Sequence, residues 1–446
     1  MKHWVSTGAA WLLISGIALA GPHPAHAPRI APHHARPYYA NTPAELVPYK
    51  GMLHKAYVAN FYETPQKWLG PGRSEREPTV RQVKIGFLGP TGSTGPLAPF
   101  GKQMLQGAQM AIADANAAGG YKGRPFVLCI NEDKARWGDS SNSMVKMYCD
   151  QNVWAVLGTV DSANSHVMMR ITLKLPIPVV NSATTDQTLM EHRVPFITRV
   201  IPDDRQYAYA TVWYLFKDRG YRNVALLRIN NRDGRFAIRK LMDGARRLGH
   251  PFIFELRFND GDTDFSEQLQ RIKDSPADAV VVWGNPRETA LIARQMRRMG
   301  MQQPIVGWFR AVDPETVRIG GEDVEGMVCP FPYDPQSPDP LARRFRERFR
   351  KRYGQDPGVF AAYAYDGMKL LTDAIKRAGL NRVRIGDALL HLKAVRGVTG
   401  PIIFDGARNN VRRIYLAQLI HHKFSFRPAT VPRPGLPEAE QSMARR

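Results

Sequence analysis

Two short stretches of small polar residues have the composition of anion-binding loops. Each follows a short apolar segment that we expect to be a strand: Gly158-Thr159-Val160-Asp161-Ser162 and Ser182-Ala183-Thr184-Thr185. The Ser162 hydroxyl, together with backbone N–H groups at the start of the next helix, could hold an anionic group. The alternative is that Ser162 only caps that helix and that the second stretch is a turn. We favour contact with a ligand.

Sequence patterns for catalysis are missing. The chain has no G-x-S-x-G, no HExxH and no zinc-type Cys/His spacing. Ser162 and His166 are four residues apart, but no acid is placed beside them. The glycine-rich loop at 89–99 lacks the Gly-Lys-Ser/Thr of a phosphate-binding loop. The histidines between 23 and 34 have nothing that fixes their geometry. We therefore expect a binding protein, not an exported hydrolase, with no cofactor and no metal site.

The charge balance is strongly basic. The 446 residues contain 62 Lys and Arg against 40 Asp and Glu, a net charge of +22. Such a charge favours acidic partners, but no helix-turn-helix or aromatic-basic groove is present, so we expect no nucleic acid. The helix expected at 338–353 is rich in Arg, which indicates either a solvated face or a surface that docks to an acidic membrane partner. Cys129 and Cys149 could form a disulfide, although we favour free, buried thiols.

The N-terminus has the features of an export signal. Lys2 and His3 precede an apolar run from Ala9 to Ala20. That run is short of the roughly 20 apolar residues that span a bilayer, and Ala18-Leu19-Ala20 has the form of a cleavage site. We expect a signal peptide at 1–20 and a periplasmic protein, the alternative being a membrane anchor. A partly flexible arm is expected at 21–80 and a disordered tail at 427–446.

The body of the chain alternates strands and helices. A first series begins at Val83, and a second begins near Arg205. Alternation with short connections predicts an α/β fold of two doubly wound parallel-sheet lobes. Three consecutive helices after residue 338 must cover an existing sheet, so the chain returns to the first lobe. We expect lobe 1 at 81–199 plus 333–397, lobe 2 at 200–332 plus 398–426, and a three-segment hinge between them.

Five segments resemble the type I periplasmic solute-binding proteins, the family of the leucine/isoleucine/valine-binding proteins of ABC transporters. They are VKIGFLGPTGSTGPLAPFG at 83–101, QGAQMAIADANAAGGYKGRPF at 106–126, GDTDFSEQLQRIKDSPADAVVVWG at 261–284, PGVFAAYAYDGMKLLTDAI at 357–375 and GVTGPIIFD at 397–405. The resemblance implies crossings between the lobes near 199–202, 328–332 and 398–401. It also implies a monomer that closes on a small molecule and delivers it to a membrane-embedded ABC permease. The alternative is a sensory domain that presents the ligand to a membrane receptor.

The resemblance also implies where the ligand lies. In relatives the place of Phe100 holds an aromatic ring against the ligand, and the place of Ser162 contacts a carboxylate. The stretch 182–185 matches one that grips carboxylate and amino groups. The ligand-binding residues that we predict are Phe100, Ser162, Ala183, Thr184, Thr185, Asp233, Asn285, Phe309 and Arg310.

The second lobe departs from the family pattern. Asp233 and Asn285 stand where amino-acid binders usually have aromatic residues. The acid that pairs with the ligand ammonium would align near Phe309, beside Arg310. A buried ammonium without an anionic partner is costly, so either Asp233 replaces that acid or Arg310 binds a second acid group. We expect a small organic acid or an amino-acid-like ligand, with organic and aromatic acids favoured over branched-chain amino acids.

Overall fold

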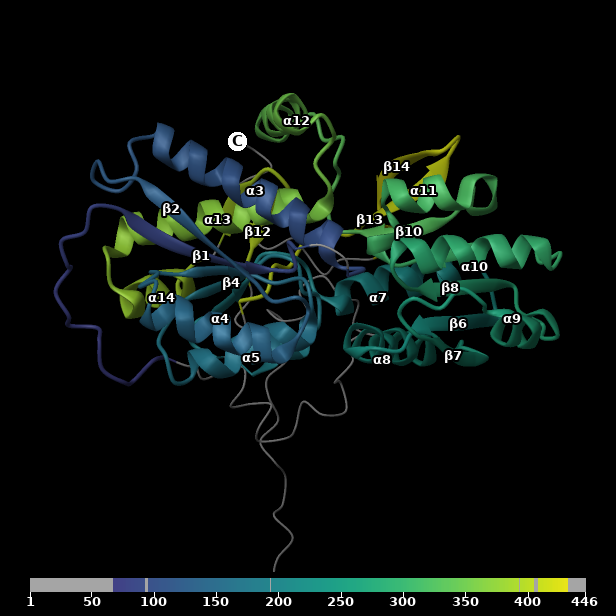
Figure 1. Ribbon diagram of the computed structural model, residues 1–446. Coiled ribbons are helices and arrows are strands. Elements are labelled where there is room, and N and C mark those ends of the chain that lie inside the picture. The colour runs from purple at the N-terminus through teal and green to yellow at the C-terminus, as the bar shows by residue number, and fades with distance from the viewer. Residues whose placement is uncertain (1–66, 93–94, 193, 393, 405–407, 432–446) are drawn as a thin grey trace, which may run out of the picture.

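The computed structural model describes residues 67–92, 95–192, 194–392, 394–404 and 408–431. The signal peptide expected at 1–20 and most of the expected arm lie outside these residues. The described chain forms two α/β lobes side by side, each built on its own sheet (Figure 1). No helix within the described ranges is both long and apolar enough to cross a membrane.

The first lobe is built on a parallel sheet with the strand order β2-β1-β3-β4-β5. Its strands are β1 (Val83–Gly89), β2 (Phe126–Glu132), β3 (Val156–Gly158), β4 (Val179–Asn181) and β5 (Ile197–Arg199). The connecting helices are α3 (Ala98–Ala117), α4 (Trp137–Cys149), α5 (Ser162–Thr172) and α6 (Thr188–Glu191). The central strands are buried on both faces, as expected where helices cover a parallel sheet.

The second lobe has a seven-stranded sheet in the order β14-β13-β10-β9-β8-β6-β7. The strands β6 to β10 are parallel, whereas β13 and β14 are antiparallel to their neighbours. The strands are β6 (Val224–Ile229), β7 (Phe254–Phe258), β8 (Ala279–Trp283), β9 (Ile305–Gly307), β10 (Val328–Phe331), β13 (Tyr415–Ile420) and β14 (Lys423–Pro428). The helices are α7 (Asp204–Trp213), α8 (Arg232–Arg247), α9 (Ser266–Lys273), α10 (Pro286–Arg298) and α11 (Pro314–Gly320).

Three further helices return to the first lobe. They are α12 (Pro340–Tyr353), α13 (Val359–Ala378) and α14 (Arg382–Leu390). The α13 helix packs along α3, as Figure 1 shows. A Cβ atom at Gly107 of α3 would lie 2.0 Å from the carbonyl oxygen of Ala361. Only glycine therefore permits the two helices to approach so closely.

Two of the expected crossings begin later in the chain than expected. The segment near 328–332 is largely strand β10 of the second sheet, so the crossing follows Phe331. The segment near 398–401 closes a hairpin between β11 (Ala394–Gly397) and β12 (Gly400–Ile403), and the chain reaches the second sheet only with β13. The Asp366 carboxylate of α13 holds this turn by accepting bonds from Val398 N at 2.7 Å and Thr399 N at 3.0 Å.

The tail expected to be disordered from residue 427 is ordered at its beginning. Strand β14 extends to Pro428, and Ala429 N donates to the Ile414 carbonyl at 2.9 Å. The Thr430 hydroxyl then bonds to the Asp218 carboxylate. Residues from 432 onward lie outside the described part of the chain.

The described end of the expected arm packs on the first lobe. The Trp68 ring lies 5.4 Å from that of Phe196, and Arg73 Nε lies 2.8 Å from Asp387 Oδ2. Cys129 and Cys149 are free thiols, as we favoured. Only Cys129 is partly buried; Cys149 is exposed because it is the last residue of α4.

Candidate ligand-binding site between the two sheets

The carboxyl ends of the parallel strands of both lobes meet. Arg310, after β9, donates through Nη2 to the carbonyl of Val160, after β3, at 3.4 Å. Gln187, after β4, donates to the carbonyl of Phe236 in α8 at 3.2 Å. The crevice at the carboxyl ends of open parallel sheets is where such folds bind ligands. Most of the predicted site residues lie at this junction.

Ser162 does not cap its helix. Asp161 is the N-cap of α5, and its Oδ1 accepts a bond from Asn164 N at 2.8 Å. The buried Ser162 Oγ finds no hydrogen-bond partner among the described residues. Thr185 Oγ1 is likewise buried and without a hydrogen bond from the described chain. Ser162 Oγ is therefore uncommitted, and Thr185 Oγ1 has only the nearby Asp204 carboxylate beside it.

The two residues between Ser182 and Thr185 are committed to the fold. Thr184 Oγ1 lies 2.7 Å from Ser165 Oγ and donates to the Thr159 carbonyl at 3.0 Å. The backbone N–H groups of Ala183 and Thr184 both donate to Asn181 Oδ1, at 3.2 and 2.9 Å. These bonds shape the loop, so the groups through which we expected Ala183 and Thr184 to bind a ligand already have partners.

Arg310 is not the unpaired cation that we expected. Its Nη2 donates to Asp233 Oδ2 at 2.9 Å, and its Nη1 donates to Asn285 Oδ1 at 3.3 Å. The guanidinium also lies over the Trp308 ring, 4.2 Å from its centroid. Arg310 and Asp233 are 1% and 3% exposed, so this is a buried ion pair. The argument that Arg310 alone favours an acidic ligand is therefore wrong.

The predicted aromatic residues form a stack that reaches both lobes. Phe309 is fully buried and lies parallel to the ring of Tyr207 in α7, with 5.0 Å between centroids. On the side of the first lobe, Phe100 contacts Phe360 of α13 at 4.7 Å, and Phe360 lies 6.0 Å from Phe309. Packing between the lobes thus accounts for the burial of Phe309 and Phe100.

Sequence reasoning missed Asp204, the first residue of α7. The carboxylate is fully buried, and neither oxygen has a hydrogen-bond partner in the described chain. Burial raises its pKa well above the usual value, against a lowering by the nearby Thr185 hydroxyl. The sequence signal was hidden because Asp203-Asp204 resembles an ordinary helix start, and Asp203 is indeed the N-cap of α7.

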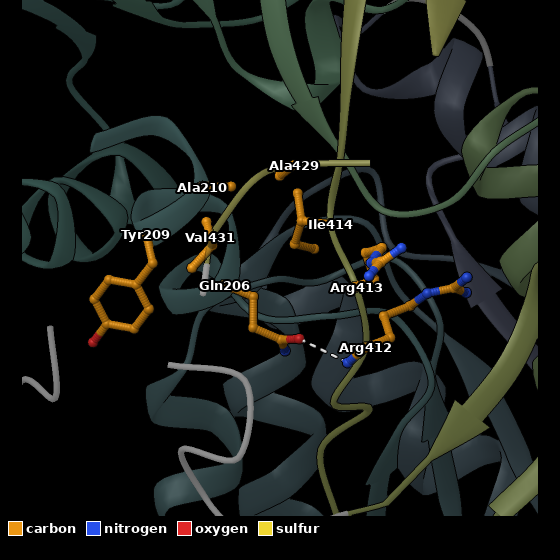
Figure 2. A pocket seen from close by; sticks show the side chains of 8 residues that line it. All are labelled: Gln206, Tyr209, Ala210, Arg412, Arg413, Ile414, Ala429 and Val431. Atoms are coloured by element: carbon orange, nitrogen blue, oxygen red, sulfur yellow. Dashed lines mark hydrogen bonds between the residues drawn. The ribbon is translucent and has the colours of Figure 1, made fainter. Parts of the chain in front are cut away.

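A shallow pocket lies elsewhere, on the second lobe. Figure 2 shows it between α7 and the segments that flank β13 and β14, with Gln206 accepting a bond from Arg412 N at 3.0 Å. None of the predicted ligand-binding residues lines it. It has little room and is lined by none of Ser162, Thr185 and Asp204, so we place the candidate site between the lobes.

Comparison with known proteins agrees with the fold of two α/β lobes. The family model described as "Periplasmic binding protein" matches residues 82–423. The chain belongs to the periplasmic binding protein family. This membership implies a substrate-binding role, a small-molecule ligand and a location outside the cytoplasm.

Individual relatives match this chain over most of their own length. The "Leu/Ile/Val-binding protein homolog 2" of Brucella abortus is 27% identical over 317 residues, which cover 70% of this chain and 84% of the relative. The leucine-binding protein LivK of Thermotoga maritima superposes with a TM-score of 0.73 at 26% identity, covering 79% and 99% of the two chains. The isoleucine complex of LivJ from Streptococcus pneumoniae gives 0.71 at 26% identity, covering 79% and 100%.

Proposed function

We propose that this periplasmic binding protein captures an amino-acid-like ligand between its lobes and delivers it to an ABC permease. The observation that carries the proposal is a set of buried polar groups without partners in the described chain: the hydroxyls of Ser162 and Thr185 and the carboxylate of Asp204. Buried polar groups are nearly always hydrogen-bonded in a finished structure. A ligand that enters between the lobes would supply the missing partners.

The three groups suit the two ends of an α-amino acid. Hydroxyls at a helix start donate to a carboxylate without a full positive charge beside it. A buried carboxylate is costly until a cation reaches it. Asp204 follows the first crossing and lies beside Thr185, whose carbonyl accepts the Asp204 backbone N–H at 2.8 Å. The α-carboxylate would therefore lie at Ser162 and Thr185, and the ammonium at Asp204.

This assignment removes the reason for favouring organic acids. The acid missing near Phe309 is replaced by Asp204 of another loop, and Arg310 is already neutralised by Asp233. The leucine- and isoleucine-binding relatives support the same class of ligand. A simple organic acid would satisfy the two hydroxyls but would leave Asp204 unpaired.

The surrounding biology follows from the sequence. A signal peptide at 1–20 would send the protein to the periplasm, where it would act as a monomer without catalysis. The alternative role is to present the ligand to a membrane receptor, because sensing also begins with ligand-driven closure. Measuring uptake of the identified ligand by cells that lack the protein separates the two roles. Loss of uptake indicates a transport component, whereas unchanged uptake indicates a sensor.

Titration calorimetry tests the ligand class. We would measure binding of the twenty amino acids and of deaminated counterparts, such as leucine against 4-methylpentanoate. The proposal expects amino acids to bind and their deaminated counterparts to bind at least tenfold more weakly. Equal or tighter binding of the deaminated acids would restore the organic-acid hypothesis and overturn this one.

A further inference from the structure

One guanidinium at the lobe junction is surrounded by three carboxylates. Arg310 donates directly to Asp233 at 2.9 Å. It also donates to Asn285, whose Nδ2 donates to Asp260 Oδ1 at 3.2 Å. The third acid, Asp161, follows the Val160 carbonyl that Arg310 also contacts, on the other lobe. Three acids against one base leave this end of the site negative when all are ionised.

The acids still have capacity for a partner. Asp233 is 3% exposed, and its Oδ1 has no hydrogen-bond partner among the described residues. Asp161 uses Oδ1 to cap α5 and is partly exposed. Burial and the charge of Asp233 raise the pKa of Asp161 to about 7, although Arg310 lowers it. The two acids, one on each lobe, repel each other when the lobes are closed and both are ionised.

We propose that the site selects an amino-acid-like ligand whose side chain ends in a cation, held between Asp161 of the first lobe and Asp233 of the second. The inference rests on the proposed function, because it assumes that the α-groups bind at Ser162, Thr185 and Asp204. A cation at this place converts a repulsion between the lobes into an attraction for both of them. It therefore favours closure, whereas an apolar side chain leaves the carboxylates desolvated and short of partners.

The aromatic rings at this end of the site face Arg310. The Arg310 guanidinium lies 4.2 Å from the Trp308 centroid and 5.9 Å from that of Phe100. This end of the site already holds one planar cation against aromatic rings, an arrangement that stabilises cations. A leucine-like side chain would instead have to pack against a buried ion pair. The second lobe therefore disfavours branched-chain ligands.

Arginine, citrulline and leucine form the decisive set of probes for calorimetry on the full-length mature protein. Citrulline has nearly the shape of arginine but carries a neutral ureido group. We expect arginine to bind at least tenfold more tightly than either of the other two. Citrulline or leucine binding as tightly as arginine would overturn the inference and leave the proposed function standing. A folded protein that binds none of the twenty amino acids would overturn both.

The substitution Asp161→Asn tests the residue itself. Asparagine is also a favoured N-cap, so α5 keeps its start while the charge is lost. We expect the ratio of arginine to citrulline affinity to fall at least fivefold. The matched control is Asp150→Asn, an exposed acid of the same lobe at the end of α4, which should leave that ratio unchanged. An unchanged ratio in Asp161→Asn would overturn the inference.

Discussion

Arg232 of the second lobe donates through Nε to Asp186 Oδ2 of the first lobe at 2.8 Å. Its Nη2 also lies 2.9 Å from both His166 Nε2 and Thr188 Oγ1. Although burial raises the pKa of Asp186, the bond from His166 and the charge of Arg232 lower it to about 2. The acid is therefore ionised at physiological pH, and this interlobe ion pair stabilises the arrangement of the lobes in this structure.

Replacing Arg232 should loosen closure without unfolding either lobe. In Arg232→Gln, Asp186 keeps its bonds to His166 and Thr188. The Arg232 side chain is about a quarter exposed, so solvent screens its ion pair with Asp186. We expect the pair to contribute ~1 kcal/mol to closure, and its loss to lower ligand affinity roughly fivefold. Stopped-flow kinetics should place most of this loss in the dissociation rate. Arg235→Gln, an exposed arginine on the same helix, is the control; equal affinities in the two variants would contradict the prediction.

Ligand should shift the lobes toward the closed arrangement. A ligand that touches both lobes binds the closed state more tightly than the open one. Small-angle scattering should therefore show a smaller radius of gyration at saturating ligand. Arg232→Gln without ligand should give a larger radius than the wild type. The same radius in all three samples would argue against a moving hinge.

Adjacent threonines should respond differently to substitution. Ser162→Ala and Thr185→Ala should each weaken binding by about 1–3 kcal/mol, because each leaves a charged ligand group short of a hydrogen bond. Thr184→Val should instead lower the free energy of unfolding, since Thr184 Oγ1 bonds to Ser165 and to the Thr159 carbonyl. Calorimetry paired with urea denaturation separates the two effects. Wild-type affinity in both alanine variants would place the ligand elsewhere.

Asp204→Asn should weaken binding while stabilising the ligand-free protein. Burial raises the pKa of Asp204 well above 3.8, so the folded state holds its proton more tightly than the unfolded state does. Ionisation of Asp204 therefore reduces the free energy of unfolding of the wild type as pH rises from about 4 toward neutrality. The variant lacks this slope. In thermal melts, the melting temperature of Asp204→Asn relative to the wild type should be higher at pH 7.5 than at pH 5. A variant that melts below the wild type at pH 7.5 would refute the assignment.

Much of the fold could be predicted because long segments with a regular hydrophobic period form the strand or helix that the period indicates. The first series of strands and helices, expected from Val83, begins with β1 at that residue, and the second, expected near Arg205, begins with α7 at Asp204. Strands β5 and β10 were missed, since they have three and four residues and show no alternation. The last two residues of the edge strand β14, Arg427 and Pro428, were expected in the tail, and both are exposed.

The candidate site was less predictable because its partners are distant in sequence. Asp233 and Arg310 are 77 residues apart, and nothing local indicates that they neutralise each other. Asp204 lacks a signal of its own, because only the three-dimensional structure shows that its carboxylate is buried without a partner. Ser162 could be identified from the composition of its loop. The structure was needed to show that Asp161 caps α5 and leaves the Ser162 hydroxyl without that role.

The α13 helix holds the chain at two of the three crossings. Asp366 holds the hairpin turn that precedes the third crossing, and Tyr363 Oη donates to the Pro332 carbonyl at the second crossing, at 3.3 Å. Arg412, on the way into β13, donates to the same tyrosine oxygen at 3.2 Å. Two linkers are thus attached to one helix of the first lobe, and we expect the lobes to rotate about these attachments and not to slide past each other. The angle of that rotation is the quantity through which a permease could distinguish a loaded protein from an empty one.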